Sequence, residues 1–585
     1  MYFALQRYLL WGVFLVPSVA LLGYSLPGYA EVALSSELIQ EQSGEQEALA
    51  RCSSLLSDVN ESCVFRDAAS LKVVQATEEA ETPTVTKIEV KKIELIDSSF
   101  AGSRELQDII KAIEGKSVSV DELTVVANQI TTWYFEQGYI TSRALVDEAG
   151  IKDGVVPIRV VEGTVEEVRV DPLPKRLSAD YVRSRIALGL TKPFSQSKLE
   201  QQLRLLQTDP LFSKVEGSVR PGSQDGKSIV VVRVTEANPF DGVVSIDNYS
   251  PPSVGSERVG LAAVHRNLTG RGDQLALSYS FTTFNSGSRL YDFNYQVPIN
   301  AMNGTLQLRT SISSVKVVQP PFDTLGISGE SQLYDLTYRQ PLIRSLTEEF
   351  ALSLGFTVQN GQTFTFAGPL PFGIGPDEEG NSRTRTIKFS QDYTRRDGGG
   401  AWGLRSQFNF GVDVLDATIN TDPEIPDGKY FSWLLQLQRL QRLGTDSTLI
   451  AQADLQLSPD GLLPSQQFVI GGGQSVRGYR QNARAADNGF KFSLENRITL
   501  SRDANGKELI QIAPFVDLGW IWNVENNPNI LQDERFIAGA GMGLLWRPLP
   551  NFNVRLDYAR PLVEIEDKQN NAQDEGFYFS VGYQL

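Results

Sequence analysis

Histidine and cysteine are almost absent from this chain of 585 residues, which contains one histidine, His265, and two cysteines, Cys52 and Cys63. A Ser-His-Asp triad needs a histidine base, and structural zinc sites usually need several histidine or cysteine ligands. A single imidazole therefore argues against most hydrolases and metalloenzymes. No other acid/base constellation is recognisable in the sequence, so we expect no enzymatic activity, no metal site and no cofactor.

Basic residues are scarce relative to acidic ones, and a phosphate-binding loop is missing. Lysine and arginine number 54 against 70 aspartate and glutamate residues, for a net charge of −16 at pH 7. This charge disfavours a nucleic-acid partner. The sequence has no G-x-x-x-x-G-K-[ST] motif, so an ATP-driven motor is unsupported. Gly539-Ala540-Gly541-Met542-Gly543 resembles a nucleotide loop, but it falls within a predicted strand and no helix follows it.

The first 30 residues are typical of an export signal. One positive charge precedes an apolar run over residues 8–26, and Gly28-Tyr29-Ala30 forms a small-x-small cleavage site. The run is also long enough to anchor the chain in a membrane. Because Pro17 interrupts it and the small residues are well placed, we predict a signal peptide over residues 1–30 that is cleaved after Ala30.

Residues 31–84 are predicted to form a leader and a linker. Leu34 and Leu38 share one face of a helical pattern, and a short acidic stretch that contains a proline follows. In an exported protein, Cys52 and Cys63 of this segment either form a disulfide or remain two free thiols. The sequence leaves both alternatives open.

Residues 85–238 contain the same strand–helix–helix–strand–strand pattern twice, which predicts two small α+β domains at residues 85–163 and 164–238. In the first domain the predicted strands are 87–90, 140–146 and 155–162, and the predicted helices are 104–114 and 120–136. In the second domain the predicted strands are 165–170, 214–219 and 228–236, and the predicted helices are 179–188 and 196–207.

Residues 239–585 change to segments of about ten residues in which apolar and polar side chains alternate, as in transmembrane β-barrels. In one such segment Trp402, Leu404 and Phe408 share one face, and Arg405 lies on the other. A soluble sandwich produces the same alternation. Charged residues on the polar face suit a water-filled lumen, and aromatic residues near the strand ends suit the membrane interface.

The number of segments and the connections between them favour the barrel. Sixteen strands can be placed, and an even number is typical of bacterial outer-membrane barrels. The connections after even-numbered strands are short, and those after odd-numbered strands are long, which matches short periplasmic turns and long external loops. The predicted fold is therefore a transmembrane β-barrel of 16 antiparallel strands over residues 239–585, preceded by two small periplasmic α+β domains.

A glycine-rich loop with one arginine, Gly471-Gly472-Gly473-Gln474-Ser475-Val476-Arg477-Gly478-Tyr479, follows the eleventh predicted strand on the external side. If the loop folds inward, Arg477 enters the lumen and needs an acceptor, because an unpaired buried charge is costly. Asp517 is the first candidate, on the predicted lumen face with Phe515 and Gly519, where Gly519 would leave room for the guanidinium. Glu495 is the second candidate.

These motifs together resemble the two-partner secretion transporters of the haemolysin secretion/activation (ShlB/FhaC/HecB) type. Val476, Arg477, Gly478 and Tyr479 match the motif at the tip of that family's inward-folded loop. Phe515, Asp517 and Gly519 match the strand that the arginine contacts. The first domain resembles a polypeptide-transport-associated (POTRA) domain through a set of seven residues: Gly138, Tyr139, Ile140, Ser142, Arg143, Glu162 and Gly163.

The resemblance implies a function in protein export. POTRA domains of this family catch an unfolded exoprotein in the periplasm and pass it through the barrel without ATP. The part of the leader near Leu34–Leu56, within residues 31–84, would then correspond to the family's lumen-plugging helix. We accordingly expect a protein of the outer membrane, in contact with its lipid, monomeric, and with one large secreted exoprotein as partner.

Two other functions remain as alternatives. A general barrel-insertion factor of the same superfamily would be expected to have more than two of the α+β domains. A passive porin for small solutes leaves the paired domains and the Arg477 loop unexplained.

Overall fold

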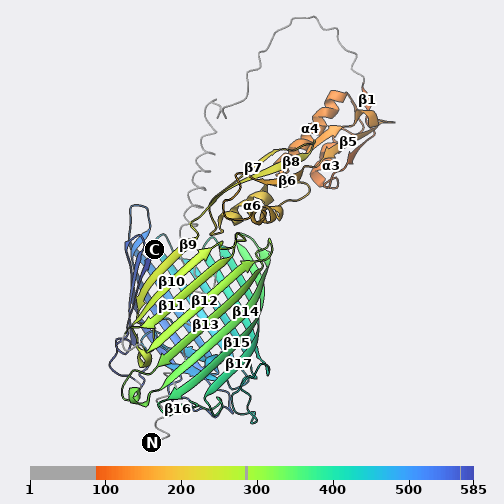
Figure 1. Ribbon diagram of the computed structural model, residues 1–585. Coiled ribbons are helices and arrows are strands. Elements are labelled where there is room, and N and C mark those ends of the chain that lie inside the picture. The colour runs from red at the N-terminus through yellow and green to blue at the C-terminus, as the bar shows by residue number, and fades with distance from the viewer. Residues whose placement is uncertain (1–86, 284–286, 567) are drawn as a thin grey trace.

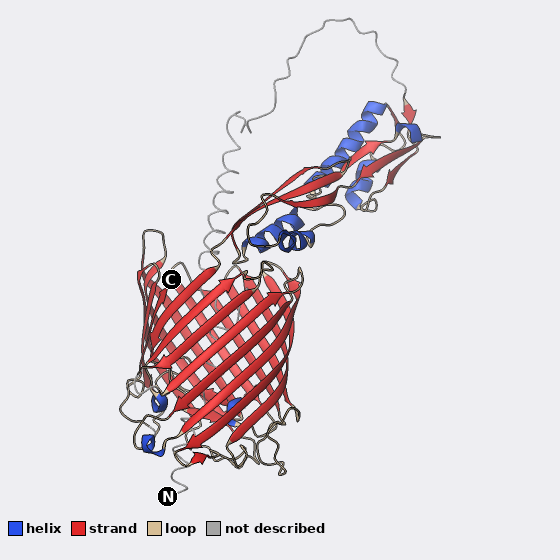
Figure 2. Cartoon of the chain, in the orientation of Figure 1, coloured by secondary structure: helices blue, strands red, loops and turns tan. Residues whose placement is uncertain are grey.

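The computed structural model describes residues 87–283, 287–566 and 568–585. Two small α+β units precede a closed β-barrel and lie beyond one of its ends (Figures 1 and 2). The predicted signal peptide, the leader and both cysteines, Cys52 and Cys63, lie outside the described residues. Among the described residues, no helix combines the length and the apolar character needed to cross a membrane.

The first unit packs its helices on one face of a three-stranded sheet of order β2-β5-β4. Buried Leu123 and Ile130 of the long helix meet Val156 and Ile158 of the central strand. The long helix begins where predicted because Ser119 and Glu122 form a capping box. The elements are β1 (Ile88–Glu89), β2 (Lys92–Ile96), α3 (Arg104–Lys111), β3 (Ser117–Val118), α4 (Val120–Glu136), β4 (Arg143–Val146), η1 (Glu148–Gly150) and β5 (Val155–Val161).

The first strand of this unit is not the one predicted. The run from Lys87 forms only the two-residue strand β1, which pairs with β3, and the sheet strand is β2, parallel to β5. Two successive runs of alternating polar and apolar residues occur here, one from Lys87 and one from Lys92. The carbonyl of Gly154 accepts hydrogen bonds from the amides of Lys91 and Lys92, at 2.8 and 3.3 Å, and so starts the ladder at the second run.

The strand predicted from Ile140 begins instead at Arg143. The amide of Ser142 donates to the carbonyl of Tyr139 at 3.0 Å, so the residues before the strand form a turn. This turn directs Ile140 into the core of the second unit.

The second unit repeats the same sheet plan. In each three-stranded sheet the strand that comes last in the chain is central. It runs parallel to the strand of that sheet that comes first and antiparallel to the remaining one. Val182 and Ile186 of one helix pack with Val230 and Val232 of the central strand. The elements are β6 (Thr164–Val170), α5 (Ala179–Ala187), α6 (Gln196–Gln207), β7 (Phe212–Pro221) and β8 (Lys227–Glu236), in the sheet order β6-β8-β7.

The rest of the described chain forms the barrel, and the predicted fold class is confirmed. The short β16 (Gly368–Pro369) pairs at the tip of β15, which pairs directly with β17, so sixteen strands among the described residues close the barrel. They are β9 (Phe240–Asp247), β10 (Arg258–Arg266), β11 (Gln274–Thr282), β12 (Ser288–Pro298), β13 (Thr305–Lys316), β14 (Ser328–Arg344), β15 (Glu348–Thr365), β17 (Asn381–Asp397), β18 (Gly400–Gly411), β19 (Phe431–Arg442), β20 (Ser447–Leu457), β23 (Asn488–Arg502), β24 (Glu508–Trp522), β25 (Phe536–Leu549), β26 (Phe552–Pro561) and β27 (Phe577–Gln584).

The connections alternate in length as expected. Short turns such as residues 398–399 and 443–446 face the α+β units, and long loops such as residues 412–430 and 458–487 lie at the opposite end (Figure 1). A barrel inserted in an outer membrane has this asymmetry, with the short turns in the periplasm. The two units therefore lie on the periplasmic side.

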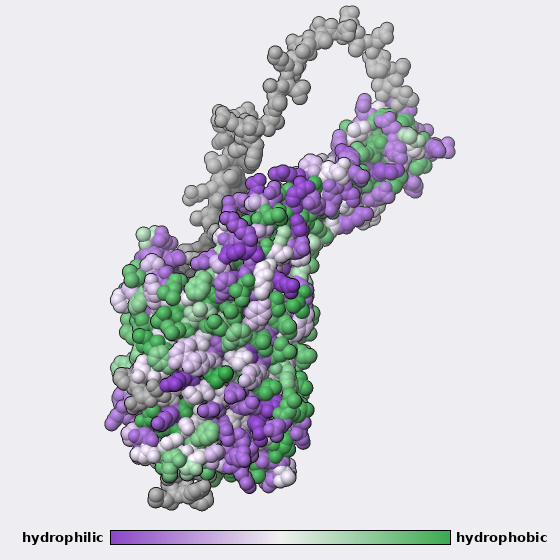
Figure 3. All heavy atoms as spheres, viewed as in Figure 1, coloured by the Kyte–Doolittle hydropathy of each residue, from purple (hydrophilic) through white to green (hydrophobic). Residues whose placement is uncertain are grey.

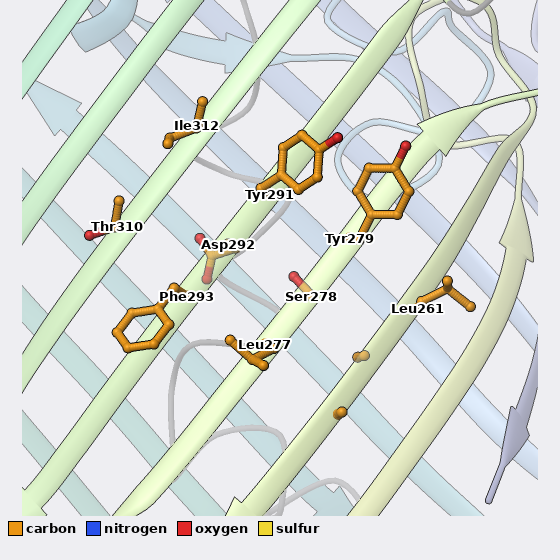
Figure 4. A pocket seen from close by; sticks show the side chains of 11 residues that line it. Leu261, Leu277, Ser278, Tyr279, Tyr291, Asp292, Phe293, Thr310 and Ile312 are labelled. Carbon is orange, nitrogen blue, oxygen red and sulfur yellow. The ribbon is translucent and has the colours of Figure 1, made fainter.

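The outer wall of the barrel carries exposed apolar side chains (Figure 3). A hollow of about 440 Å³ lies on this wall, across strands β10 to β13. Figure 4 shows side chains that line it. Outward-facing Leu261, Leu277, Tyr291, Phe293 and Ile312, which are 37–52% exposed, line it. An apolar surface of this extent is expected on a barrel that contacts lipid.

Candidate functional site

The loop of residues 458–487, between β20 and β23, folds back into the barrel, and we call it the inner loop. It contains η4 (Pro464–Gln466) and a short hairpin of β21 (Phe468–Ile470) and β22 (Arg484–Ala486). Ile470 and Val476 of the loop are buried against lumen-facing Ile521 and Ile537 of the barrel wall. The tip of the loop is therefore held inside the lumen.

Arg477 at this tip binds Asp517 of β24 through three donors. Its Nε and Nη2 donate to Oδ2 and Oδ1 at 2.6 and 2.9 Å, and its backbone amide donates to Oδ2 at 3.1 Å. Both residues are almost fully buried, with side chains 6% and 0% exposed. A bidentate pair of this kind is both strong and geometrically specific.

The second sequence candidate, Glu495, binds Arg477 as well. Nη1 of Arg477 donates to Glu495 Oε2 at 2.7 Å and lies 3.8 Å from Asp557. Arg555 of β26 binds Glu495 at 2.6 Å and Asp557 at 2.7 Å, and Arg497 binds Glu495 at 2.8 Å. Three arginines and three carboxylates thus form one charge-balanced cluster around the tip, which offsets much of the cost of burying each charge.

The ring of Phe515 forms the other side of the arginine pocket. The guanidinium carbon of Arg477 lies 3.3 Å from the ring centroid, a cation–π contact. Phe515 is the register partner of Glu495, and Asp517 is the register partner of Ser493. Nη2 of Arg477 also donates to Ser493 Oγ at 3.4 Å. Four side chains that contact Arg477 therefore project from neighbouring positions on the lumen face of β23 and β24.

Gly478 and Tyr479 fix the loop tip to the last strands. Gly478 has φ +103°, a conformation that favours glycine, and its amide donates to the hydroxyl of Tyr578 at 2.9 Å. The same hydroxyl donates to the carbonyl of Tyr479 at 2.6 Å. The hydroxyl of Tyr479 lies 2.7 Å from the carbonyl oxygen of Ala538.

The expected role of Gly519 is wrong. A Cβ at Gly519 would lie 2.9 Å from Ile470 and 3.1 Å from Val476, so the glycine leaves room for apolar side chains of the inner loop and not for the guanidinium. The guanidinium lies over Phe515, two residues earlier on the same face.

Three glycines of β25 belong to the site although their motif resembles a nucleotide loop. Gly539, Gly541 and Gly543 are register partners of Asp517, Phe515 and Ala513, on the lumen face. A side chain at Gly539 would collide with the carbonyl of Arg477, and one at Gly541 would lie 2.7 Å from the Phe515 ring. The alternation of glycine within a predicted barrel strand was the available signal, because it leaves one face of that strand without side chains.

The predicted residues of the first unit lie together where the two units meet. The Glu162 carboxylate accepts hydrogen bonds from the amide of Ser99 at 2.6 Å and from the hydroxyl of Tyr134 at 3.0 Å. Burial raises the pKa of Tyr134 to about 12, so its hydroxyl stays protonated and remains a donor at neutral pH. Gly163 donates to Ser142 Oγ at 3.0 Å, and its carbonyl accepts from the amide of Phe194 in the second unit at 2.7 Å.

The remaining residues of the set also connect the two units. The carbonyl of Gly138 accepts a hydrogen bond from Gln196 at 3.0 Å, and Arg143 forms an ion pair with Asp225. Ile140 packs in the second core, as described above, while the ring of Tyr139 stays with the aromatic cluster of the first.

We expect Gly163→Ala to loosen this junction, because a Cβ there would collide with Thr141. Overpacking of this kind costs about 1–3 kcal/mol. Hydrogen exchange of the full-length protein should accelerate in peptides that cover residues 155–170, by about tenfold for each 1.4 kcal/mol lost. Gly102→Ala is the matched control, since nothing lies within 4 Å of a Cβ there. Equal exchange in the two variants would contradict this account of the junction.

The second unit rests on the periplasmic turns of the barrel. The amide of Ser178 donates to the carbonyl of Gly270 at 2.8 Å, and Arg185 donates to Asn303 at 3.1 Å. The guanidinium of Arg185 stacks on the ring of Tyr181 at 3.3 Å. Burial lowers the pKa of this guanidinium. The Arg271-Gly272-Asp273 sequence lies in one of these turns, against Tyr181.

Comparison with known proteins identifies the family. The family described as haemolysin secretion/activation protein ShlB/FhaC/HecB matches residues 226–545, more than half of the chain. The POTRA domain of ShlB type matches residues 88–163. The chain is 23% identical over 466 residues to the outer membrane transporter CdiB of Dickeya dadantii (strain 3937), covering 79% of this chain and 78% of that protein.

Two further similarities agree with this match. The chain is 23% identical over 489 residues to the heme/hemopexin transporter protein HuxB of Haemophilus influenzae (strain 86-028NP), covering 82% of this chain and 83% of that protein. The solved structure of CdiB from Escherichia coli shares the fold, with a TM-score of 0.65 at 19% identity over 94% of this chain and 98% of that one. The chain therefore belongs to the haemolysin secretion/activation (ShlB/FhaC/HecB) family of two-partner secretion transporters, with a barrel in the outer membrane and POTRA domains in the periplasm.

Proposed function

We propose that this transporter acts as a monomer and secretes one dedicated, large exoprotein. The two POTRA domains, residues 85–163 and 164–238, bind unfolded segments of the exoprotein and deliver them to the lumen. The exoprotein passes when the inner loop leaves its position. The observation that carries the proposal is the burial of Arg477 in a charge-balanced cluster, because this cluster holds a loop across the path that the exoprotein would take.

The lumen wall supports the passage of an extended chain. Its charged side chains are paired with each other across neighbouring strands, as in Arg309 with Asp292 at 2.9 Å and Lys491 with Asp454 at 2.7 Å. Paired charges offer a polar surface to peptide groups without one strong unpaired site that would retain a segment. Such a wall suits a client that moves through without folding inside.

The sheet edges of the POTRA domains support capture of the client. β7 is an edge strand of ten residues in the second sheet, and most of its side chains are exposed. An extended segment can add to such an edge by backbone hydrogen bonds, with little demand on its side chains. The second POTRA domain rests on the barrel rim, so a segment bound there is already next to the lumen.

Photo-crosslinking during export tests the capture step. A benzoylphenylalanine in place of exposed Ser218 on β7 should crosslink to the secreted protein in growing cells. The control is the same substitution at Asp180, an exposed position at the start of α5. If both positions crosslink equally, or only Asp180 does, β7 is not the binding edge.

A further inference from the structure

The seam where the barrel closes, between β9 and β27, has a short backbone ladder. It contains five register pairs, from Val243↔Gln584 to Asp247↔Ser580, whereas β9 and β10 share eight. Beyond the ladder the external end of the seam is closed by Asn248, whose backbone amide donates to the carbonyl of Phe579 at 3.3 Å and whose side chain makes two further bonds. Asn248 donates through Nδ2 to the carbonyl of Phe577 at 3.0 Å and accepts at Oδ1 from the amide of Phe579 at 2.9 Å.

A second buried amide joins this end of the seam to the inner loop. Gln573, fully buried in the loop before β27, donates to the carbonyl oxygens of Asn248 and Ser250, the latter at 2.8 Å. Its Oε1 accepts from the backbone amide of Gln481 at 2.8 Å. One side chain from the β27 side of the seam thus contacts both the β9 side and the inner loop.

Next to this amide, Arg480 of the inner loop forms a bidentate pair with Asp574. Its Nε and Nη2 donate to the two carboxylate oxygens at 2.5 and 2.8 Å, with side chains 14% and 1% exposed. The Asp574 carboxylate also accepts from the amide of Asn571 at 2.9 Å. This pair is separate from the Arg477 cluster and lies on the external side of it.

The geometry points to Arg480 as a second positioning residue of the inner loop, one that couples the loop to the external end of the β9–β27 seam through Asp574 and Gln573. The inference rests on the proposed function, in which the loop must leave the lumen. When the loop leaves, Arg480 and Gln481 withdraw from Asp574 and Gln573. The side-chain contacts that close the seam then lose a partner, so loop release and loosening of the seam occur together.

Hydrogen exchange of the full-length protein in lipid nanodiscs tests this coupling without any client. Arg480→Ala and Asp574→Ala should each accelerate exchange in residues 243–250 and 577–584 by about tenfold, the effect of one charged hydrogen bond. The exchanged pair Arg480→Asp with Asp574→Arg should restore protection. Arg383→Ala is the control, because Arg383 binds Asp377 and Asp416 of other external loops. Acceleration confined to the inner loop would overturn the inference.

A reciprocal measurement separates coupling from local damage. Cysteines replace the register partners Val243 and Gln584, far from Arg480 along the seam, in a chain with Cys52→Ser and Cys63→Ser. If loop and seam are coupled, oxidation should slow exchange in residues 472–482, and reduction should reverse the effect. Unchanged exchange in that segment would reject the coupling. Because this variant keeps Arg480, the measurement remains decisive even if Arg480→Ala fails to fold. Normal export from a strain that lacks the transporter would instead reject the proposed function and leave the exchange results standing.

Discussion

Replacing Arg477 with alanine should reduce secretion of the exoprotein by tenfold or more while the barrel still assembles. The side chain makes bidentate bonds to Asp517, binds Glu495 and stacks on Phe515. Removing one partner from a buried ion pair costs about 3–5 kcal/mol. About 1.4 kcal/mol already changes the equilibrium between the inserted and the released loop tenfold. The inner loop then no longer returns reliably to its place in the lumen.

Secreted protein in the medium and heat-modifiable barrel in the outer membrane are the two quantities to measure. Arg439→Ala is the matched control, because Arg439 is another barrel arginine with a bidentate carboxylate partner, Asp397, and this pair lies next to the periplasmic turn of residues 398–399. Arg477→Lys should recover only part of the activity, since an ammonium cannot make the planar bidentate contact. Secretion at the wild-type level from Arg477→Ala would refute the role of this residue.

Replacing Asp517 with alanine should have the second largest effect on secretion. The carboxylate is completely buried and accepts from three donors of Arg477 and from Ser493 Oγ at 2.6 Å. Its loss leaves Arg477 with Glu495, so the loop keeps part of its anchor. We therefore expect a defect smaller than that of Arg477→Ala but in the same direction.

The double variant Arg477→Ala with Asp517→Ala decides whether the two residues act as a pair. If they do, the double variant should secrete about as much as Arg477→Ala alone, because the second change removes an interaction that is already lost. A double variant much worse than either single variant would show independent roles. Asp397→Ala, which removes the partner of Arg439, serves as the control for loss of a carboxylate that is paired with an arginine.

Much of the barrel and of the arginine site is predictable from the sequence, for identifiable physical reasons. A barrel strand has one lipid face and one lumen face, so alternation such as Trp402, Leu404 and Phe408 against Arg405 reports the strand directly. The partner of Arg477 was predictable because a buried guanidinium requires a carboxylate, and Asp517 and Glu495 lie on the lumen faces of the following strands.

The remaining contacts depend on the path of the inner loop through the lumen. No local sequence pattern predicts this path. Gly519 faces Ile470 and Val476 because the β21–β22 hairpin lies across β24, and the sequence does not show where that hairpin lies. The role of Gly539 is hidden for the same reason, since only the position of the Arg477 carbonyl explains it. The first sheet strand is predicted at Lys87 and found at Lys92 because two adjacent runs of alternating apolar and polar residues compete for one place in the sheet.

Mass spectrometry of the culture medium and of the outer membrane, compared between the wild type and a deletion of this gene, tests the central claim most directly. Dedicated two-partner secretion predicts the loss of one or a few large proteins from the medium, with other outer-membrane barrels at their normal level. The deletion strain that is complemented with the wild-type gene should again release these proteins into the medium. The deletion strain that is complemented with the Arg477→Ala gene should not. A general fall in outer-membrane barrels, or a medium that is unchanged by the deletion, would contradict the account.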